Sequence, residues 1–117
     1  MPQIYLTHRA IEDIQNIYDY SVKEWEKSVA DKYLDEIQTV LILLQENPGL
    51  LKMTSQISSR FKTYPLKRHW LICDVIDNDI YILTIRHVSM NLLERLKKLA
   101  PSLEHEALAL YKRLKNK

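Results

Sequence analysis

The stretch RHWLICDVIDNDIYILTIRH, residues 68–87, decides the fold of this chain of 117 residues. Both of its halves are rich in β-branched and aromatic residues, which favour strands. Between them, Asp77-Asn78-Asp79 is typical of a tight hairpin turn. The stretch therefore predicts two antiparallel strands. Alternation in the second strand places Ile80, Ile82, Thr84 and Arg86 on one face and Tyr81, Leu83, Ile85 and His87 on the other.

Two further strands are predicted on the amino-terminal side of this hairpin. Residues 59–66, SRFKTYPL, have the same composition, and Pro65 is expected to end this strand or to lie on a sheet edge. Short turns join these three strands into an antiparallel meander. At the start of the chain, Ile4 and Leu6 alternate with Tyr5, which predicts a short strand that joins the same sheet to bury its apolar residues.

Two amphipathic helices with a very short connection are predicted between residues 8 and 46. Thr7 is expected to cap the first helix, and Ser28 with Asp31 resembles a capping box at the start of the second. Asn47-Pro48-Gly49 ends the second helix. The apolar stripes are Ala10, Ile14, Ile17 and Ser21 beside Ile11, Tyr18, Val22 and Trp25 in the first helix, and Ala30, Tyr33, Leu34, Ile37, Leu41 and Leu44 in the second.

The predicted fold is α+β, in the order β-α-α-β-β-β, with an antiparallel helical hairpin between the first strand and the meander. This domain is expected to span residues 1–90. Residues 91–117 are expected to form a helical extension packed on the same domain. The extension is predicted as two amphipathic helices separated by Pro101, with Ser102 as a cap.

Composition indicates one globular domain in a reducing compartment. Hydrophobic residues make up 46% and charged residues 27% of the chain. The single cysteine, Cys73, forms no internal disulfide and favours a cytoplasmic location. No signal peptide and no membrane segment are predicted. The single glycine, Gly49, excludes a glycine-rich phosphate loop.

The charge is unevenly distributed along the chain. Residues 1–50 contain four Lys and Arg against nine Asp and Glu, a net charge of −5, and residues 51–117 contain thirteen against six, a net charge of +7. This asymmetry suggests either a basic face for an anionic partner or a solvated surface without one.

Candidate functional residues lie in the strand half of the chain. The four histidines have no metal-ligand spacing, and Cys73 lies in an apolar run typical of a core. Basic and aromatic residues at the strand ends are expected to form a cationic concavity that binds phosphate or an acidic protein segment. The alternative is that they are only solvent-exposed residues where the strands end. The set consists of Arg60, Lys62, Tyr64, Lys67, Arg68, His69, Arg86 and His87.

Two residues of the second helix do not fit its apolar stripe. Ile42 and Leu43 lie well off the face that carries Ile37, Leu41 and Leu44. Either the helix is buried on most sides near its end, or these residues form an exposed patch for a partner.

Several motifs in this order resemble the RelE/ParE superfamily of toxins from type II toxin–antitoxin systems, and its ParE branch most closely. The resemblance extends roughly from Ile4 to Met90. Its motifs are A-x-x-D-x-x-x-I-x-x-Y from Ala10 to Tyr20, A-x-x-Y-L-x-x-I from Ala30 to Ile37, L-x-x-N-P from Leu44 to Pro48, R-x-x-x-Y-P-L-x-R-H-W-L-I from Arg60 to Ile72, and I-L-T-I-R-H from Ile82 to His87.

The resemblance implies a growth-arresting bacterial toxin of the kind linked to plasmid stabilization. ParE-like members inhibit DNA gyrase, which would need no catalytic residue and no cofactor here. RelE-like members cut mRNA on the ribosome, and His87 would then be the base with Arg60, Arg68 or Arg86 as cations. Val88 stands where nucleases often carry Tyr, and LLKMTSQ, residues 50–56, lacks the acidic residue of some nucleases. A third hypothesis is an inert antitoxin-binding module.

The resemblance also implies partners. The target, gyrase or alternatively the ribosome and mRNA, would contact Arg60, Tyr64, Lys67, Arg68, His69, Arg86 and His87. The cognate antitoxin would be acidic and partly disordered when free. Ile42 and Leu43 are expected in or near its groove, and a toxin dimer or a toxin–antitoxin hetero-oligomer is expected as the assembly.

Overall fold

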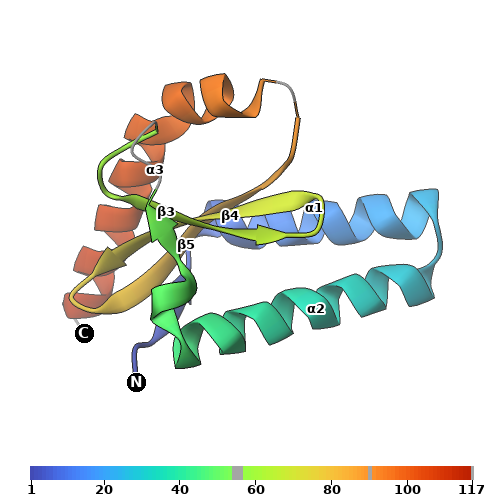
Figure 1. Ribbon diagram of the computed structural model, residues 1–117, viewed down its shortest axis with the longest axis horizontal. Helices are drawn as coiled ribbons and strands as arrows, with labels where there is room; N and C mark the ends of the chain where they lie inside the picture. Colours follow the sequence, from blue (N-terminus) through green and yellow to red (C-terminus); the bar gives the residue numbers. More distant parts are fainter. Residues whose placement is uncertain (54–56, 90, 117) are drawn as a thin grey trace.

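The computed structural model describes residues 1–53, 57–89 and 91–116 as one sheet with helices on both faces (Figure 1). The five strands lie in the order β1-β5-β4-β3-β2. In chain order the elements are β1 (Ile4–Leu6), α1 (His8–Glu24), α2 (Lys27–Glu46), the 3-10 turn η1 (Pro48–Leu50), β2 (Lys52–Met53), β3 (Phe61–Leu66), β4 (His69–Ile76), β5 (Asp79–His87) and α3 (Leu92–Lys115).

The predicted α+β fold is confirmed. Strands β3, β4 and β5 form the antiparallel meander, and β1 joins the sheet beside β5 in parallel register. Strand β2, antiparallel to β3, was not predicted because two residues carry no periodicity. Part of the expected polar connection between β2 and β3, residues 54–56, lies outside the described residues.

Turn chemistry fixes the register of the meander. Asp77 and Asn78 have φ values of 51° and 69°, the left-handed pair of a type I′ hairpin turn between β4 and β5. Lys67 has a φ of 55° in the turn between β3 and β4. Pro65 lies beyond the last pair that β2 makes with β3, so its missing N–H leaves no gap in that ladder, as expected for an edge position.

The predicted alternation along β5 is wrong beyond Leu83. Cys73 pairs with Ile82 whereas Ile72 pairs with Thr84, so one extra residue of β5 forms a β-bulge. The bulge shifts the later side chains by one position. Ile85 therefore packs in the same core as Ile80 and Ile82.

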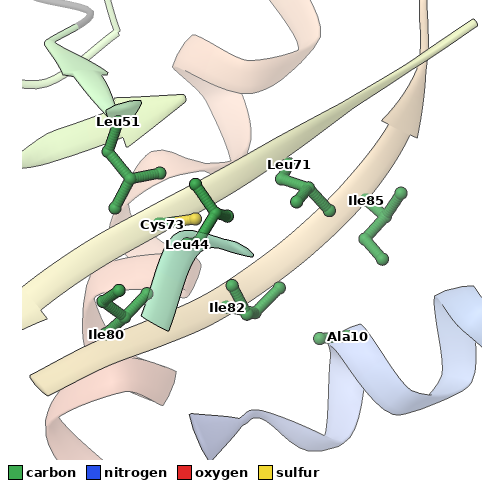
Figure 2. Packing of buried hydrophobic residues seen from close by; sticks show 8 residues of the cluster. All are labelled: Ala10, Leu44, Leu51, Leu71, Cys73, Ile80, Ile82 and Ile85. Carbon is green, nitrogen blue, oxygen red and sulfur yellow. The ribbon is translucent and has the colours of Figure 1, made fainter. Parts of the chain in front are cut away.

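The first core lies between the sheet and the hairpin of α1 and α2 (Figure 2). Thr7 caps α1 as expected, because its Oγ1 accepts from the amide of Ala10 at 3.2 Å; it also donates to the carbonyl of Leu83 at 3.0 Å. The buried residues of this core are Ala10, Leu44, Leu51, Leu71, Cys73, Ile80, Ile82 and Ile85. Cys73 is thus a core residue, as predicted.

Two details of the helical hairpin differ from the predictions. The predicted second stripe of α1 is mostly exposed, with Ile11, Val22 and Trp25 at 53%, 39% and 69%, because the first stripe is the one that faces the core. Tyr18 of the second stripe does reach α2, where its hydroxyl donates to Asp31 at 2.7 Å. Helix α2 begins at Lys27 after Glu26, one residue before Ser28. The Ser28 hydroxyl donates to the Glu26 carboxylate at 2.7 Å instead of capping the helix.

The extension forms one helix, α3, and not two helices separated by Pro101. Pro101 removes one backbone hydrogen bond, but Ala100 and Leu103 on either side of it are buried, so packing holds the helix together. Figure 1 shows that the two ends of α3 run in different directions, the bend expected of an internal proline. Ser102 lies inside α3 and is not its cap.

Helix α3 covers the sheet face opposite α1 and α2 and builds a second core. Leu96, Ala100, Leu103 and Ala107 pack there against strand residues Phe61, Ile72, Tyr81 and Leu83. Two polar contacts near its carboxyl end add to the packing. Arg9 donates to both carboxylate oxygens of Glu106 at 2.9 and 2.8 Å, and Tyr111 donates to Asp77 at 2.6 Å. No helix in the described part of the chain is long and apolar enough to cross a membrane.

Candidate functional site: the basic end of the sheet

One end of the sheet brings together the turn after β3 and the last residues of β5. His69 at the start of β4 pairs in register with His87 at the end of β5. Their rings lie 5.2 Å apart, edge to face. The amide of Val88 donates to the carbonyl of Arg68 at 2.7 Å. The β4–β5 turn lies at the opposite end of the two strands, so their free ends meet here as the meander predicts.

Helix α2 supports His69 from behind. The Tyr33 hydroxyl donates to the carbonyl of Leu66 at 3.2 Å and contacts Nδ1 of His69. Burial, assisted by Glu36, raises the pKa of Tyr33 to about 12, so the hydroxyl keeps its proton. Because the hydroxyl donates its single proton to the carbonyl of Leu66, its oxygen can accept a hydrogen bond from Nδ1 of His69. Burial, and next His87, lowers the pKa of His69, which favours a neutral imidazole.

A second contact joins the turn to the same helix. Lys67 Nζ lies 2.8 Å from the carboxylate of Glu36 in α2. The backbone of Lys67 has the left-handed conformation in the turn, and the ion pair with Glu36 ties this residue to α2. The charge of Lys67 is therefore partly neutralised within the protein, whereas Arg68 beside it is exposed.

Arg86 is positioned by a chain of hydrogen bonds across β5. Its Nε donates to Thr84 Oγ1 at 3.2 Å, and the Thr84 hydroxyl donates to the carboxylate of Asp13 in α1. Asp13 also accepts the amide of Ile85 at 3.1 Å. Strand β1 pairs with β5 only as far as Ile82. Beyond that residue, the Asp13 carboxylate is the acceptor for the backbone amide of Ile85 on the edge of β5.

Arg86 and His87 line a pocket of about 540 Å³ between the end of β5 and the first turns of α3. The other lining residues are Ser89, Leu92, Arg95, Leu96, Lys98 and Leu99. The pocket therefore combines cationic groups with a leucine wall. Within the described ranges, no three His, Cys, Asp or Glu side chains converge as metal ligands would.

Two residues of the predicted target-binding set are not part of this surface, Arg60 because it lies away from this end of the sheet and Tyr64 because it packs inward. Arg60 precedes β3 and forms an ion pair with Asp74, near the opposite end of β4 from His69. Tyr64 packs against the first core. Lys67, Arg68, His69, Arg86 and His87 are the residues that the fold brings together. Their role in binding stays a prediction.

The predicted antitoxin-binding residues differ in exposure. Ile42 is 51% exposed, and Leu43 next to it is half-buried. The end of α2 is therefore not buried on all sides, and Ile42 offers an apolar side chain at the surface. The contact with an antitoxin stays a prediction.

The sequence did not indicate several residues of the site. Tyr33 was placed in an apolar stripe, where a phenol ring is indistinguishable from other core residues. Arg95 and Lys98 have the helical spacing that puts them on one side of α3, which is a usable signal. Their meeting with Arg86 depends on where α3 packs, and periodicity does not report this.

The fold and the basic end of the sheet define a small α+β protein, and the match to a family model is more specific. The model described as ParE toxin of the type II toxin–antitoxin system, parDE, matches residues 4–92, so the chain belongs to this family. The predicted resemblance is thereby confirmed. No curated protein matches the chain.

Solved structures share the fold. One from the chromosomal ParDE toxin–antitoxin system of P. aeruginosa is 23% identical with a TM-score of 0.67, and the similarity covers 76% of this chain and 98% of that chain. The YoeB dimer from Staphylococcus aureus is 19% identical with a TM-score of 0.53, covering 75% of this chain and 98% of that chain. At these identities the likeness shows the fold alone.

Proposed function

We propose that this ParE-family toxin arrests bacterial growth by inhibiting DNA gyrase, and that a cognate antitoxin neutralises it in the cytoplasm. The family match over residues 4–92 carries the proposal. The buried, free Cys73 supports a reducing compartment. Residues 1–90 would form the toxin domain and residues 91–117 an extension of it.

The basic end of the sheet would make the contact with the target. Arg68 and His87 are exposed there, and Arg86 is half-buried beside them. A gyrase complex holding cleaved DNA offers phosphates and acidic protein groups, both of which bind guanidinium groups through charge-assisted hydrogen bonds. No group of this set needs to act as a catalyst in such a mechanism.

A second candidate function is ribosome-dependent cleavage of mRNA. The observation that favours it is that His87, an exposed imidazole, lines the same pocket as the guanidinium of Arg86. A nuclease of this kind needs a base near the 2′-hydroxyl and a cation near the scissile phosphate. Val88 follows His87 where nuclease members often carry Tyr, which weighs against this candidate.

The antitoxin would contact the apolar surface near the end of α2. Ile42 is exposed there, and a partner that folds on binding would bury it. We expect Ile42→Glu and Leu43→Glu to weaken antitoxin binding, with Gln38→Glu, an exposed position of the same helix, as the control. Unchanged binding of both variants in calorimetry would exclude this surface. Two similar structures are a YoeB dimer and a YoeB–YefM complex from Staphylococcus aureus, which supports a hetero-oligomer or a dimer here.

Pulse-labelling after induction in bacteria distinguishes the two functions. We expect thymidine incorporation to fall before methionine incorporation, and purified protein to inhibit supercoiling by gyrase. An earlier fall in methionine incorporation contradicts gyrase inhibition and makes His87 the leading catalytic candidate. The double variant Arg86→Ala and His87→Ala, compared with Lys97→Ala, then shows whether the pocket residues act in cleavage. If neither incorporation falls, the chain is not an active toxin.

A further inference from the structure

The pocket between β5 and α3 contains basic side chains that form no ion pair with a carboxylate in the described part of the chain. Arg9, Arg60, Lys67 and Lys115 each pair with a carboxylate. In the described part of the chain, no such ion pair involves any of the pocket's basic side chains, Arg86, His87, Arg95 and Lys98. A concave site that holds several unpaired cations favours an anionic ligand.

Two of these basic side chains are held by contacts within the fold. Arg86 is fixed through Thr84, and the ring of His87 lies against that of His69. Arg95 and Lys98 lie three residues apart on α3, so they project from adjacent positions on the helix. Preorganised donors lose less freedom on binding than mobile ones, which favours affinity.

The apolar part of the pocket limits the kind of anion that fits. Leu92, Leu96 and Leu99 line it from α3, and no Phe, Tyr or Trp side chain is among the described residues that line it. Single-stranded nucleic acids bind through stacking on aromatic rings as well as through phosphates. A peptide with carboxylates and an apolar side chain on one face matches both the cations and the leucine wall.

We propose that this pocket binds an acidic, amphipathic peptide segment, and that the segment belongs to the antitoxin. The proposal rests on the proposed function only for the identity of that partner. The family match ends at residue 92, whereas Arg95, Leu96, Lys98 and Leu99 lie beyond it. The pocket is thus built jointly by the family domain and the extension, and it would select the antitoxin of this particular toxin.

The test uses a short fluorescent peptide that carries Glu and Leu at helical spacing. Fluorescence anisotropy measures its binding to the full chain. We expect the double variant Arg95→Glu and Lys98→Glu to weaken binding by at least about tenfold, since it places like charges in the pocket. The control, Lys97→Glu with Lys112→Glu, makes the same change in net charge at exposed positions outside the pocket. We expect a change below about twofold there, because separated surface charges are screened. Circular dichroism checks that both variants are folded.

Two further probes make the result decisive. A peptide with Ser in place of Leu should bind at least about tenfold more weakly, because it loses contact with the leucine wall. A single-stranded oligonucleotide of equal charge should bind more weakly than the Glu and Leu peptide. Four outcomes would each overturn the proposal. They are an equal loss of affinity in the pocket and control variants, no loss of affinity for the Ser peptide, tighter binding of the oligonucleotide than of the Glu and Leu peptide, and no peptide binding at all.

The growth assay separates this proposal from the proposed function. Peptide binding without growth arrest would contradict the toxin function and leave the pocket's ligand class standing. Growth arrest without peptide binding would overturn the pocket proposal and leave the toxin function standing.

Discussion

The residue whose environment most directly predicts a pH effect is His69. Burial, and next His87, lowers the pKa of His69 below its ordinary value. The unfolded chain therefore binds this proton more readily than the folded chain, and stability is lost as the pH falls through about 6.5 toward the lowered value. Besides His87, the ring of His69 contacts the hydroxyl of Tyr33, which keeps its proton throughout this pH range.

We expect the wild-type protein to lose more stability between about pH 7.5 and pH 5.5 than the variant His69→Asn, whose amide donates a hydrogen bond but does not titrate. Urea unfolding at both pH values measures the difference. His105→Asn, an exposed histidine of α3, is the control and should keep the wild-type slope. If His69→Asn keeps that slope as well, His69 is not the source of the pH dependence.

Arg60 is the second residue with a specific prediction. Asp74 is buried beneath it, and burial raises the pKa of this carboxyl group while Arg60 opposes the shift. Arg60→Ala leaves a buried acceptor without its partner, so we expect a loss of about 1 to 3 kcal/mol in the free energy of unfolding. Arg68→Ala, at an exposed position, should cost less than about 0.5 kcal/mol. Equal costs for the two variants would show that the Arg60–Asp74 pair does not stabilise the fold.

At the scale of single elements, the cap of α1 can be compared with Ser102, a predicted cap that lies inside α3. Thr7 caps α1 and also donates to the buried carbonyl of Leu83. Thr7→Ala should therefore cost about 1 to 2 kcal/mol of stability. Ser102→Ala should cost less than about 0.5 kcal/mol, because Ser102 lies inside α3 and is exposed. Thermal unfolding of both variants measures this. A larger cost at Ser102 would indicate a helix end at Pro101.

The sequence predicts an element well when the residues that determine it lie within that element, and poorly when it depends on packing against distant segments. The β4–β5 hairpin follows from Asp77 and Asn78, and the cap of α1 follows from Thr7, so both were predicted. The bulge at Leu83 and the continuation of α3 through Pro101 depend on packing across the sheet. The meeting of His69 with His87 follows from the meander, whereas the contribution of Arg95 and Lys98 follows only from the position of α3.

At the scale of the whole molecule, α3 completes the fold by covering the second face of the sheet. Leu103 is fully buried against that face, and Leu108 on the same helix is 39% exposed. We expect Leu103→Ala to cost about 2 to 5 kcal/mol of stability, since it leaves a cavity between α3 and the sheet. Leu108→Ala should cost less than about 1 kcal/mol. Urea unfolding measures both, and similar costs would mean that α3 is not integral to the fold.

The parallel pairing of β1 with β5 has a consequence for the nascent chain. Residues 4–6 are made first, but their partners, residues 80–82, are made after two thirds of the chain. Contacts between segments so distant in sequence form slowly and only after both have left the exit tunnel. The finished sheet, and with it the basic end, therefore assembles only after β5 has been made. An inhibitor already present in the cell meets the protein as it acquires its active shape.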